Sequence, residues 1–419
     1  MAAVLLLGTL DTKGTEILFV RDLLRAAGLS VTVLDAGVHP HAHPADVTAS
    51  EVFAAAGTSL DAVRKAADRG TAVTAAAKGA AKVATQLFER GDVAGILSLG
   101  GSAGTTIGTA AMRALPFGLP KLMVSTLASG QMRPYIGVRD ILMMNSVVDV
   151  SGLNRVSRTV FSNAANAMIG MVRTNSKLRT PNSETSEIVT ATMFGVTTPC
   201  VEAARVRIES GGFEVLVFHA TGVGGQTMEA FVGDGMVCGV LDITTTELAD
   251  ELVGGILSAG PDRLTAAALR AVPQVISVGA LDMVNFGPPE TVPEKFRGRR
   301  FYQHNPNVTL MRTTPDENDR LGKEIALKAS AARGPTTVLL PLRGVSALDC
   351  ADGAFWWPEA DRALFESLRL WMSPHVKLVE LDLHINDPEF ARAAAEMLLG
   401  MLGRVRRAEL KPRNRSGTA

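Results

Sequence analysis

Two glycine- and hydroxyl-rich segments each follow an aliphatic strand pattern and precede a helix pattern. The first glycine loop is Gly100-Gly101-Ser102-Ala103-Gly104-Thr105, and the second is Thr221-Gly222-Val223-Gly224-Gly225-Gln226-Thr227. Because glycine has no Cβ, backbone N–H groups there can approach an anion, and the following helix adds the positive end of its dipole. Each loop therefore predicts a phosphate site, although glycines that only make a tight turn would give the same pattern.

The first glycine loop has polar companions at the ends of neighbouring predicted strands. Hydroxyl and N–H groups can bind phosphates, Lys13 can neutralise one, and Asp11 can hold magnesium. A P-loop is absent, because Gly322-Lys323 is followed by Glu324. The alternative for Asp11 and Lys13 is a helix N-terminal acid and a solvated lysine. The predicted cofactor-binding residues are Gly8, Thr9, Asp11, Thr12, Lys13, Gly100, Gly101, Ser102, Gly104, Thr105, Ser129 and Gly130.

The second glycine loop favours a small substrate with a carboxylate or phosphate. His219 and Glu229 are the acid–base candidates beside it, and Arg312 is a candidate anion clamp; a buried, hydrogen-bonded His219 is the structural alternative. A dinucleotide site is a rival hypothesis, since Asp242 follows Gly222 by 20 residues, as a ribose-binding carboxylate does. The predicted substrate-binding residues are Thr221, Gly222, Gly224, Gly225, Thr227 and Arg312.

Three alternating histidines lie in His39-Pro40-His41-Ala42-His43-Pro44. Histidines at this spacing can bind a metal from an extended strand. Two prolines, and no nearby carboxylate in sequence beyond Asp46, favour a solvated loop instead.

Continuous aliphatic strand patterns alternate with helix patterns, as in parallel sheets covered by helices on both faces. The chain therefore predicts an α/β fold with two Rossmann-like doubly wound parallel-sheet domains, at 1–180 and 181–407, facing each other across a cleft. A polar stretch at 174–186 is the predicted linker, and 408–419 a disordered basic tail. The predicted strands are 3–10, 30–36, 93–99, 121–127, 141–148, 187–194, 213–219, 236–243, 274–279, 308–312, 336–341 and 376–383; the predicted helices are 14–27, 60–90, 105–115, 153–173, 199–210, 227–232, 247–257, 262–271, 315–332, 359–371 and 388–402.

The composition excludes several classes of protein. Among 419 residues, 42 basic side chains balance 42 acidic ones, so no basic field predicts nucleic-acid binding. Three scattered cysteines, Cys200, Cys238 and Cys350, favour neither a disulfide framework nor a zinc site, and indicate a reducing cytoplasm. No apolar run is long enough for a membrane helix, and the apolar start is interrupted by charged residues, so we expect a strand there instead of a signal peptide.

Five motifs in order along the chain resemble one family. They are Leu7-Gly8-Thr9-Leu10-Asp11-Thr12-Lys13-Gly14, the first glycine loop, the stretch from His219 to Glu229, the stretch from His304 to Thr313, and Ile385-Asn386-Asp387-Pro388-Glu389-Phe390-Ala391. The resemblance extends to about residue 405 and is to a largely uncharacterised family that includes the ATP-binding N-terminal domain of a plant tobamovirus-resistance protein. It implies two Rossmann-like domains, a homodimer, and ATP with magnesium as the ligand.

Together these observations predict a cytoplasmic protein that binds ATP and magnesium. The first hypothesis is a metabolic enzyme that acts on a small molecule in the cleft between the domains. The second is a nucleotide-regulated module that binds another protein without catalysis, and the third is an NAD-dependent oxidoreductase.

Overall fold

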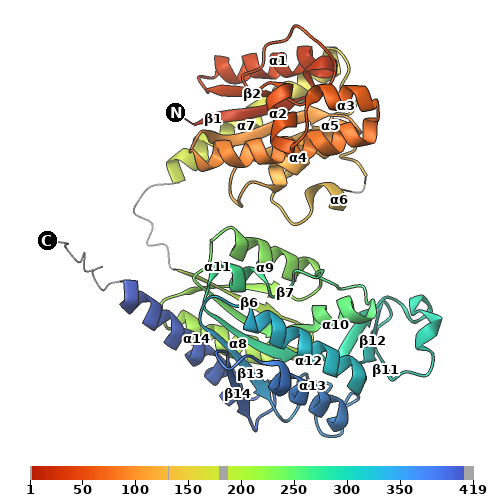
Figure 1. Ribbon diagram of the computed structural model, residues 1–419, viewed down its shortest axis with the longest axis vertical. Helices are drawn as coiled ribbons and strands as arrows, with labels where there is room; N and C mark the ends of the chain where they lie inside the picture. Colours follow the sequence, from red (N-terminus) through yellow and green to blue (C-terminus); the bar gives the residue numbers. More distant parts are fainter. Residues whose placement is uncertain (1, 131, 179–186, 410–419) are drawn as a thin grey trace, which may run out of the picture. The chain divides into compact units, whose positions relative to one another are not determined.

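The computed structural model describes residues 2–130, 132–178 and 187–409 and divides into two compact units (Figure 1). Unit 1 is Met1–Ser183 and unit 2 is Glu184–Ala419. Residues 179–186 of the predicted linker and 410–419 of the predicted basic tail lie outside the described residues.

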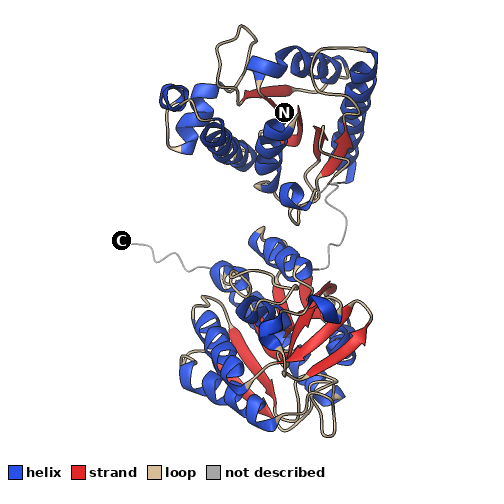
Figure 2. Cartoon of the chain, turned by 90° about the vertical axis from the view of Figure 1, so that its right-hand side faces the viewer, coloured by secondary structure: helices blue, strands red, loops and turns tan. Residues whose placement is uncertain are grey.

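Unit 1 is a parallel sheet with helices on both faces (Figure 2). The strand order is β2-β1-β3-β4-β5, and in the aligned register Leu6 of β1 lies opposite Val33 of β2 and Leu97 of β3. Its elements are β1 (Ala3–Gly8), α1 (Leu10–Ala26), β2 (Val31–Asp35), α2 (Ala49–Ala56), α3 (Leu60–Ala66), α4 (Arg69–Glu89), β3 (Val93–Gly100), α5 (Ser102–Arg113), β4 (Lys121–Ser125), α6 (Arg133–Ile136), β5 (Leu142–Asn145) and α7 (Arg155–Leu178).

The first strand shows why this sequence forms a two-sided sheet. Successive side chains of a strand point to opposite faces. In β1, Leu5 and Leu7 pack in a core with α4 and α5, whereas Val4 and Leu6 pack in a second core with α1 and α7. An uninterrupted aliphatic run is therefore needed to fill both layers.

The strand order of unit 1 determines where a ligand can bind. The chain moves from β1 to β2 on one side, then returns to add β3 on the other side of β1. The crossovers therefore diverge at the carboxyl ends of β1 and β3, which is the switch point where doubly wound sheets bind ligands. The turn Thr9–Lys13 and the first glycine loop meet at this point.

Unit 2 repeats the arrangement and adds a small antiparallel sheet. Its parallel sheet has the order β14-β13-β9-β8-β6-β7, and the second sheet has the order β10-β12-β11. Its elements are β6 (Ile188–Met193), η1 (Gly195–Thr197), α8 (Thr198–Glu209), β7 (Glu214–His219), α9 (Val223–Gly233), β8 (Gly239–Thr244), α10 (Thr246–Val253), α11 (Ala266–Arg270), β9 (Gln274–Gly279), β10 (Met283–Phe286), η2 (Pro289–Thr291), η3 (Glu294–Phe296), β11 (Phe301–Asn305), β12 (Val308–Arg312), α12 (Pro315–Ser330), β13 (Thr336–Pro341), α13 (Pro358–Trp371), β14 (Lys377–Leu381) and α14 (Pro388–Glu409).

These two Rossmann-like units confirm the predicted fold class, but one predicted helix was wrong, and α2 and the antiparallel sheet were missed. The predicted helix 60–90 is two helices, because Ala67 takes a left-handed conformation and Asp68 caps a new helix at Thr71 N. Helix α2 was missed although Thr48 and Glu51 form its capping box. The antiparallel sheet was missed because the residues of β11 are exposed and β10 has only four residues.

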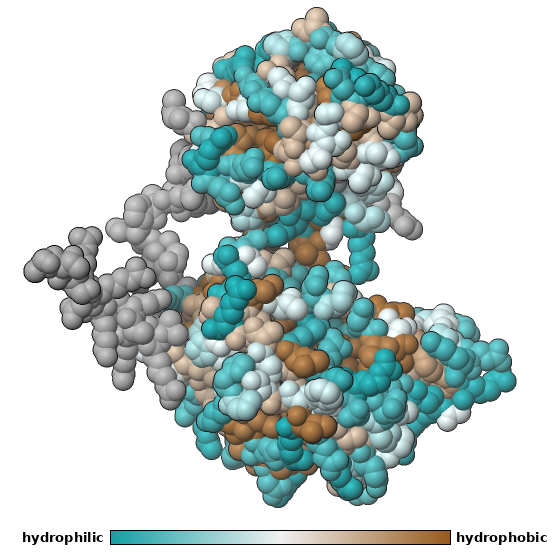
Figure 3. Space-filling model, viewed as in Figure 1, coloured by the Kyte–Doolittle hydropathy of each residue, from teal (hydrophilic) through white to brown (hydrophobic). Residues whose placement is uncertain are grey.

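The visible face of each unit mixes hydrophilic and hydrophobic residues (Figure 3). Among the described helices, none combines the length and the apolar character that crossing a membrane requires.

Candidate functional site

A cavity of about 610 Å³ lies at the carboxyl edge of the unit 1 sheet. Thr9, which follows β1, and Asp11 and Thr12 in the first turn of α1 contribute to its lining, and α5 contributes Ala103 at its first turn. Apolar side chains of α3, α4 and α5 line another part of it, among them Val73. The unit 1 cavity thus combines a polar rim at the switch point with an apolar wall, within the usual volume of small-molecule sites.

The amino end of α5 has free hydrogen-bond donors beside this cavity, which Ala103 lines. Its N-cap is Gly101, which offers no side chain, and the first bond of the helix runs from Thr105 N to Gly101 O. The N–H groups of residues 102–104 have no acceptor among the described residues. A helix end of this kind is suited to an anion.

Two carboxylates fasten the turns after β1 and β2 to each other. Asp35 Oδ1 accepts hydrogen bonds from Leu10 N at 3.0 Å and Gly37 N at 2.8 Å. Asp11 Oδ2 accepts from Val38 N and His39 N, each at 2.9 Å. The other oxygen of Asp11, Oδ1, is buried and has no partner among the described residues. Asp11 is therefore held rigidly, with one carboxylate oxygen left for a ligand.

The histidine loop is exposed at His39, Pro40, Ala42 and Pro44, as expected of a solvated loop, and it is anchored to the end of β2 through His41. His41 Nε2 lies 2.8 Å from Asp35 Oδ2, and His41 Nδ1 accepts from His43 N at 3.2 Å. Because Nδ1 accepts a hydrogen bond, the ring proton is on Nε2, which donates to Asp35. The carboxylate partner comes from the end of β2, six residues away in sequence. No group of three or more metal-ligating side chains is arranged around a common point in the described part of the chain.

The remaining predicted residues of unit 1 lie in three kinds of position. Gly8, Gly100 and Gly104 are packing residues: a Cβ on Gly8 would lie 2.5 Å from Ile17, and a Cβ on Gly100 would lie 2.8 Å from Gly104 Cα. Thr105 is fully buried and bonded to Ser125 Oγ at 2.6 Å, so it joins α5 to β4 instead of facing a ligand. Outside the cavity lining lie Lys13, at a kink in α1, Ser102, exposed at the start of α5, and Ser129 and Gly130, in an exposed turn.

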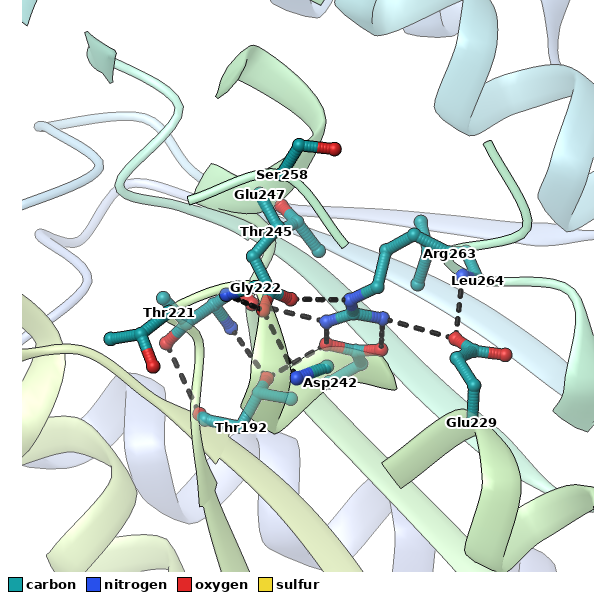
Figure 4. Close-up of polar contacts among 12 residues, drawn as sticks. Thr192, Thr221, Gly222, Glu229, Asp242, Thr245, Glu247, Ser258, Arg263 and Leu264 are labelled. Atoms are coloured by element: carbon teal, nitrogen blue, oxygen red, sulfur yellow. Dashed lines mark hydrogen bonds and ion pairs between the residues drawn. The ribbon is translucent and has the colours of Figure 1, made fainter. Parts of the chain in front are cut away.

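The second glycine loop binds an anion of the protein itself (Figure 4). Glu247 Oε1, from α10, accepts from Gly222 N at 2.7 Å and from Gly225 N at 3.0 Å. Glu247 is fully buried. Its carboxylate takes the place that a ligand phosphate has in a glycine-rich loop. A substrate anion, as expected for this loop, would have to compete with Glu247 for the same amides.

Arg263 joins this carboxylate to two others. It binds Asp242 through both terminal nitrogens, each at 2.6 Å, and Glu247 through Nε at 2.7 Å. Asp242 is thus used inside unit 2, which removes the ribose contact on which the dinucleotide hypothesis depended. Burial raises the pKa of the Glu247 carboxyl above its ordinary value, although the charge of Arg263 acts in the opposite direction.

Glu229 also has a structural role instead of the expected catalytic one. Its two oxygens accept from Leu264 N at 2.6 Å and Ala266 N at 2.8 Å, next to an ion pair with Arg263 at 3.3 Å. Burial raises its pKa, and the charge of Arg263 opposes that rise. Its function is to hold the chain segment that carries Arg263 against α9.

His219 and Arg312 lie in different environments: the first is exposed and the second is buried. His219 ends β7 as an exposed residue, not the buried one that the structural alternative expected. Arg312 is 1% exposed and donates to Phe355 O at 2.7 Å, Thr313 Oγ1 at 2.8 Å and Asp361 Oδ1 at 2.6 Å. The expectation of an anion clamp is therefore corrected: this guanidinium is a buried counter-ion.

The sequence analysis missed Glu247, Arg263 and the two arginines of the cavity wall, Arg64 and Arg69. A glutamate that follows the hydroxyl run Thr244-Thr245-Thr246 at a strand end is a usable signal for Glu247. No local pattern identifies Arg263, because its three partners come from three different elements.

The fold and the site define a two-unit α/β protein with a glycine loop and a cavity at the switch point of the unit 1 sheet. Within that class, the chain belongs to the UPF0261 family: the model of the uncharacterised protein family (UPF0261) N-terminal domain matches residues 2–177, and that of its C-terminal domain matches residues 186–402. The predicted family resemblance is thereby confirmed.

The relatives of this chain include bacterial and plant proteins. A UPF0261 protein of Clostridium tetani is 48% identical over 402 residues, with 95% of this chain and 98% of that protein covered. The ToMV resistance protein Tm-1(GCR237) of Solanum lycopersicum is 40% identical over 426 residues, covering 97% of this chain and 56% of that protein. A crystal structure from Listeria monocytogenes, described as a UDP-N-acetylglucosamine 2-epimerase, covers 90% of this chain and 93% of that one at 11% identity, with a TM-score of 0.22, and supports no functional argument.

Proposed function

We propose that unit 1 binds ATP with magnesium in its cavity. The observation that carries the proposal is the contrast between the two glycine loops. In unit 2 the loop amides are bonded to Glu247, whereas in unit 1 the amides of residues 102–104 have no acceptor among the described residues, and Ala103 of this segment lines the cavity. The triphosphate would bind these amides and the hydroxyls of Thr9 and Thr12, with the base against the apolar wall.

Asp11 fits a magnesium ligand. Magnesium in nucleotide sites is bound through one or two carboxylates together with phosphate oxygens, so a three-residue cluster is not required. The partnerless Oδ1 of Asp11 meets that need, since Asp35 uses both of its oxygens within the protein. A Cβ at Gly37 would lie 2.7 Å from Asp11 Oδ1, so glycine at this position leaves the space beside that oxygen unfilled by a side chain.

Two uses of the bound nucleotide are proposed. The first is an enzyme in which ATP activates a small molecule. The second is a module in which ATP controls binding to another protein. The position of Glu229 supports the second, because this expected acid–base residue is bonded to the backbone of its own unit. Hydrolysis of ATP by the purified protein, followed as phosphate release with and without candidate small molecules, separates them.

The test of the binding site is a thermal-shift titration with Mg-ATP, Mg-ADP and NAD. At 100 times its dissociation constant, a ligand that binds only the folded state stabilises it by about 2.7 kcal/mol. Gly101→Val places a side chain at the start of α5, where the nearest atom to a Cβ is Thr126 Oγ1 at 3.8 Å, so the fold is retained. We expect this variant to lose the ATP-dependent shift.

The matched control is Gly130→Val, in the exposed turn after β4 on the same sheet edge; unlike Gly101, this glycine does not precede the free amides of α5. We expect it to keep the shift. A shift with NAD but not with ATP, or an unaltered ATP shift in Gly101→Val, would overturn the proposal.

A further inference from the structure

Two arginines of the unit 1 cavity come from one short stretch of chain, at the α3–α4 junction. Arg64 Nε donates to Val38 O at 2.5 Å, which fastens α3 to the turn after β2. Arg69 is exposed and has no hydrogen bond or ion pair with any residue that the structure describes. The neighbouring carboxylate of Asp68 is directed to Thr71 N at 2.6 Å, as the cap of α4.

The position of Arg69 is electrostatically unfavourable in the protein alone. It is the first residue of α4, where the helix dipole is positive and a cation is disfavoured. Neither local helix electrostatics nor an ion pair explains a cation at this place. An anion in the adjacent cavity would supply the missing counter-charge.

The stretch that carries both arginines is weakly attached to the rest of unit 1. Of the seven residues in α3, only Val63 is buried. Left-handed residues precede and follow the helix: Gly57 with φ of 88° and Ala67 with φ of 50°. An element with so few buried side chains opens at low free-energy cost, and the residues at its two ends can absorb the change in backbone angles.

We propose that α3 and the first turn of α4, residues 57–71, form a lid that closes over the nucleotide and that Arg69 binds its phosphates. This inference rests on the proposed function and names the residue that completes the site. A guanidinium can bind two phosphate oxygens at once, which suits it to close a site whose other phosphate donors are backbone amides and hydroxyls. Arg64 stays bonded to Val38 O and acts as the fixed side of the lid.

Limited trypsin digestion of the full chain tests the closure. Lys65 and Arg69 are exposed cleavage sites within the lid, and Arg297, whose side chain is 83% exposed in unit 2, is the reference site. We expect Mg-ATP to slow cleavage in the lid at least about fivefold and to leave cleavage at Arg297 unchanged. Equal rates with and without Mg-ATP overturn the closure.

The proposed contact between Arg69 and the phosphates is tested by measuring the affinity of the Arg69→Gln variant for Mg-ATP by calorimetry. We expect the dissociation constant to rise about tenfold, as for the loss of one charge-assisted contact. Arg90→Gln removes the same charge from unit 1 at a side chain that is 65% exposed and outside the cavity lining, and should bind as the parent does. Unfolding without nucleotide should show Arg69→Gln to be as stable as the parent or slightly more so.

The two proposals can fail separately. If Mg-ATP raises the melting temperature but Arg69→Gln binds it normally and the lid is not protected, the lid is overturned and the nucleotide site stands. If no nucleotide produces a shift, both are overturned.

Discussion

Replacing Glu247 by alanine tests whether this carboxylate acts as an internal ligand of the second glycine loop. The change removes the acceptor of three buried donors: Gly222 N, Gly225 N and Arg263 Nε. Breaking a buried charge pair costs about 3–5 kcal/mol, and a buried N–H without a partner about 1–3 kcal/mol. Because Arg263 keeps its two bonds to Asp242, we expect a loss near the lower end, about 3 kcal/mol.

Urea unfolding followed by tryptophan fluorescence measures this loss in the relevant unit, because Trp356, Trp357 and Trp371 all belong to unit 2. Glu202→Ala is the control: its side chain is 48% exposed and forms only a surface pair, so its loss should stay below about 1 kcal/mol.

A second measurement separates a ligand-like carboxylate from general damage to the core. Acetate or phosphate should restore part of the stability of Glu247→Ala, because either anion can bind the vacated amides, and should have no comparable effect on the parent. A loss of less than about 1 kcal/mol in Glu247→Ala would refute the reasoning, since three buried donors cannot lose their acceptor at so small a cost.

Three further predictions concern unit 2. Burial raises the pKa of Asp282 to about 7 and that of Asp361 to about 8. The folded state therefore retains protons that the unfolded chain releases near pH 4. Because of this difference, the stability should fall as the pH rises from about 4 to 8. Asp282→Asn should reduce this fall by on the order of 1 kcal/mol per pH unit between pH 5 and 7, and an unchanged slope in urea unfolding would contradict it. Cys200 is buried and its pKa is raised to about 12 by burial, so a thiol reagent at pH 8 should modify it only after unfolding; labelling in the folded protein, mapped by mass spectrometry, would be the contrary result. Gly224→Val should prevent unit 2 from folding, because a Cβ there would lie 1.7 Å from His219 O, and a native tryptophan spectrum would show otherwise.

The sequence predicted the layered architecture well, because a doubly wound sheet needs aliphatic runs that are visible without any tertiary information. Leu5 and Leu7 fill one core and Val4 and Leu6 the other, so the run itself carries the signal. The same kind of local signal identified both strand–glycine–helix turns.

The sequence could not predict whether the amides of each turn face a cavity or bind a side chain of the protein, because this depends on contacts between distant residues. Whether loop amides face a cavity or a carboxylate is decided by Glu247, 25 residues beyond Gly222, and by Arg263 behind it. Likewise Arg312 has the residue type of an anion clamp, but its partner Asp361 comes from α13, 49 residues away. Residue type gives the chemistry that is possible, whereas burial and long-range partners decide which chemistry is used.

The carboxylate built into the second glycine loop makes the stability of unit 2 independent of any ligand concentration at that loop. In unit 1 the corresponding amides would be stabilised by mass action, to an extent that follows the free concentration of whatever binds them. On the proposed function, a fall in nucleotide would therefore loosen one unit while leaving the other folded. The lifetime of such a chain among cellular proteases would follow the nucleotide supply through unit 1 alone.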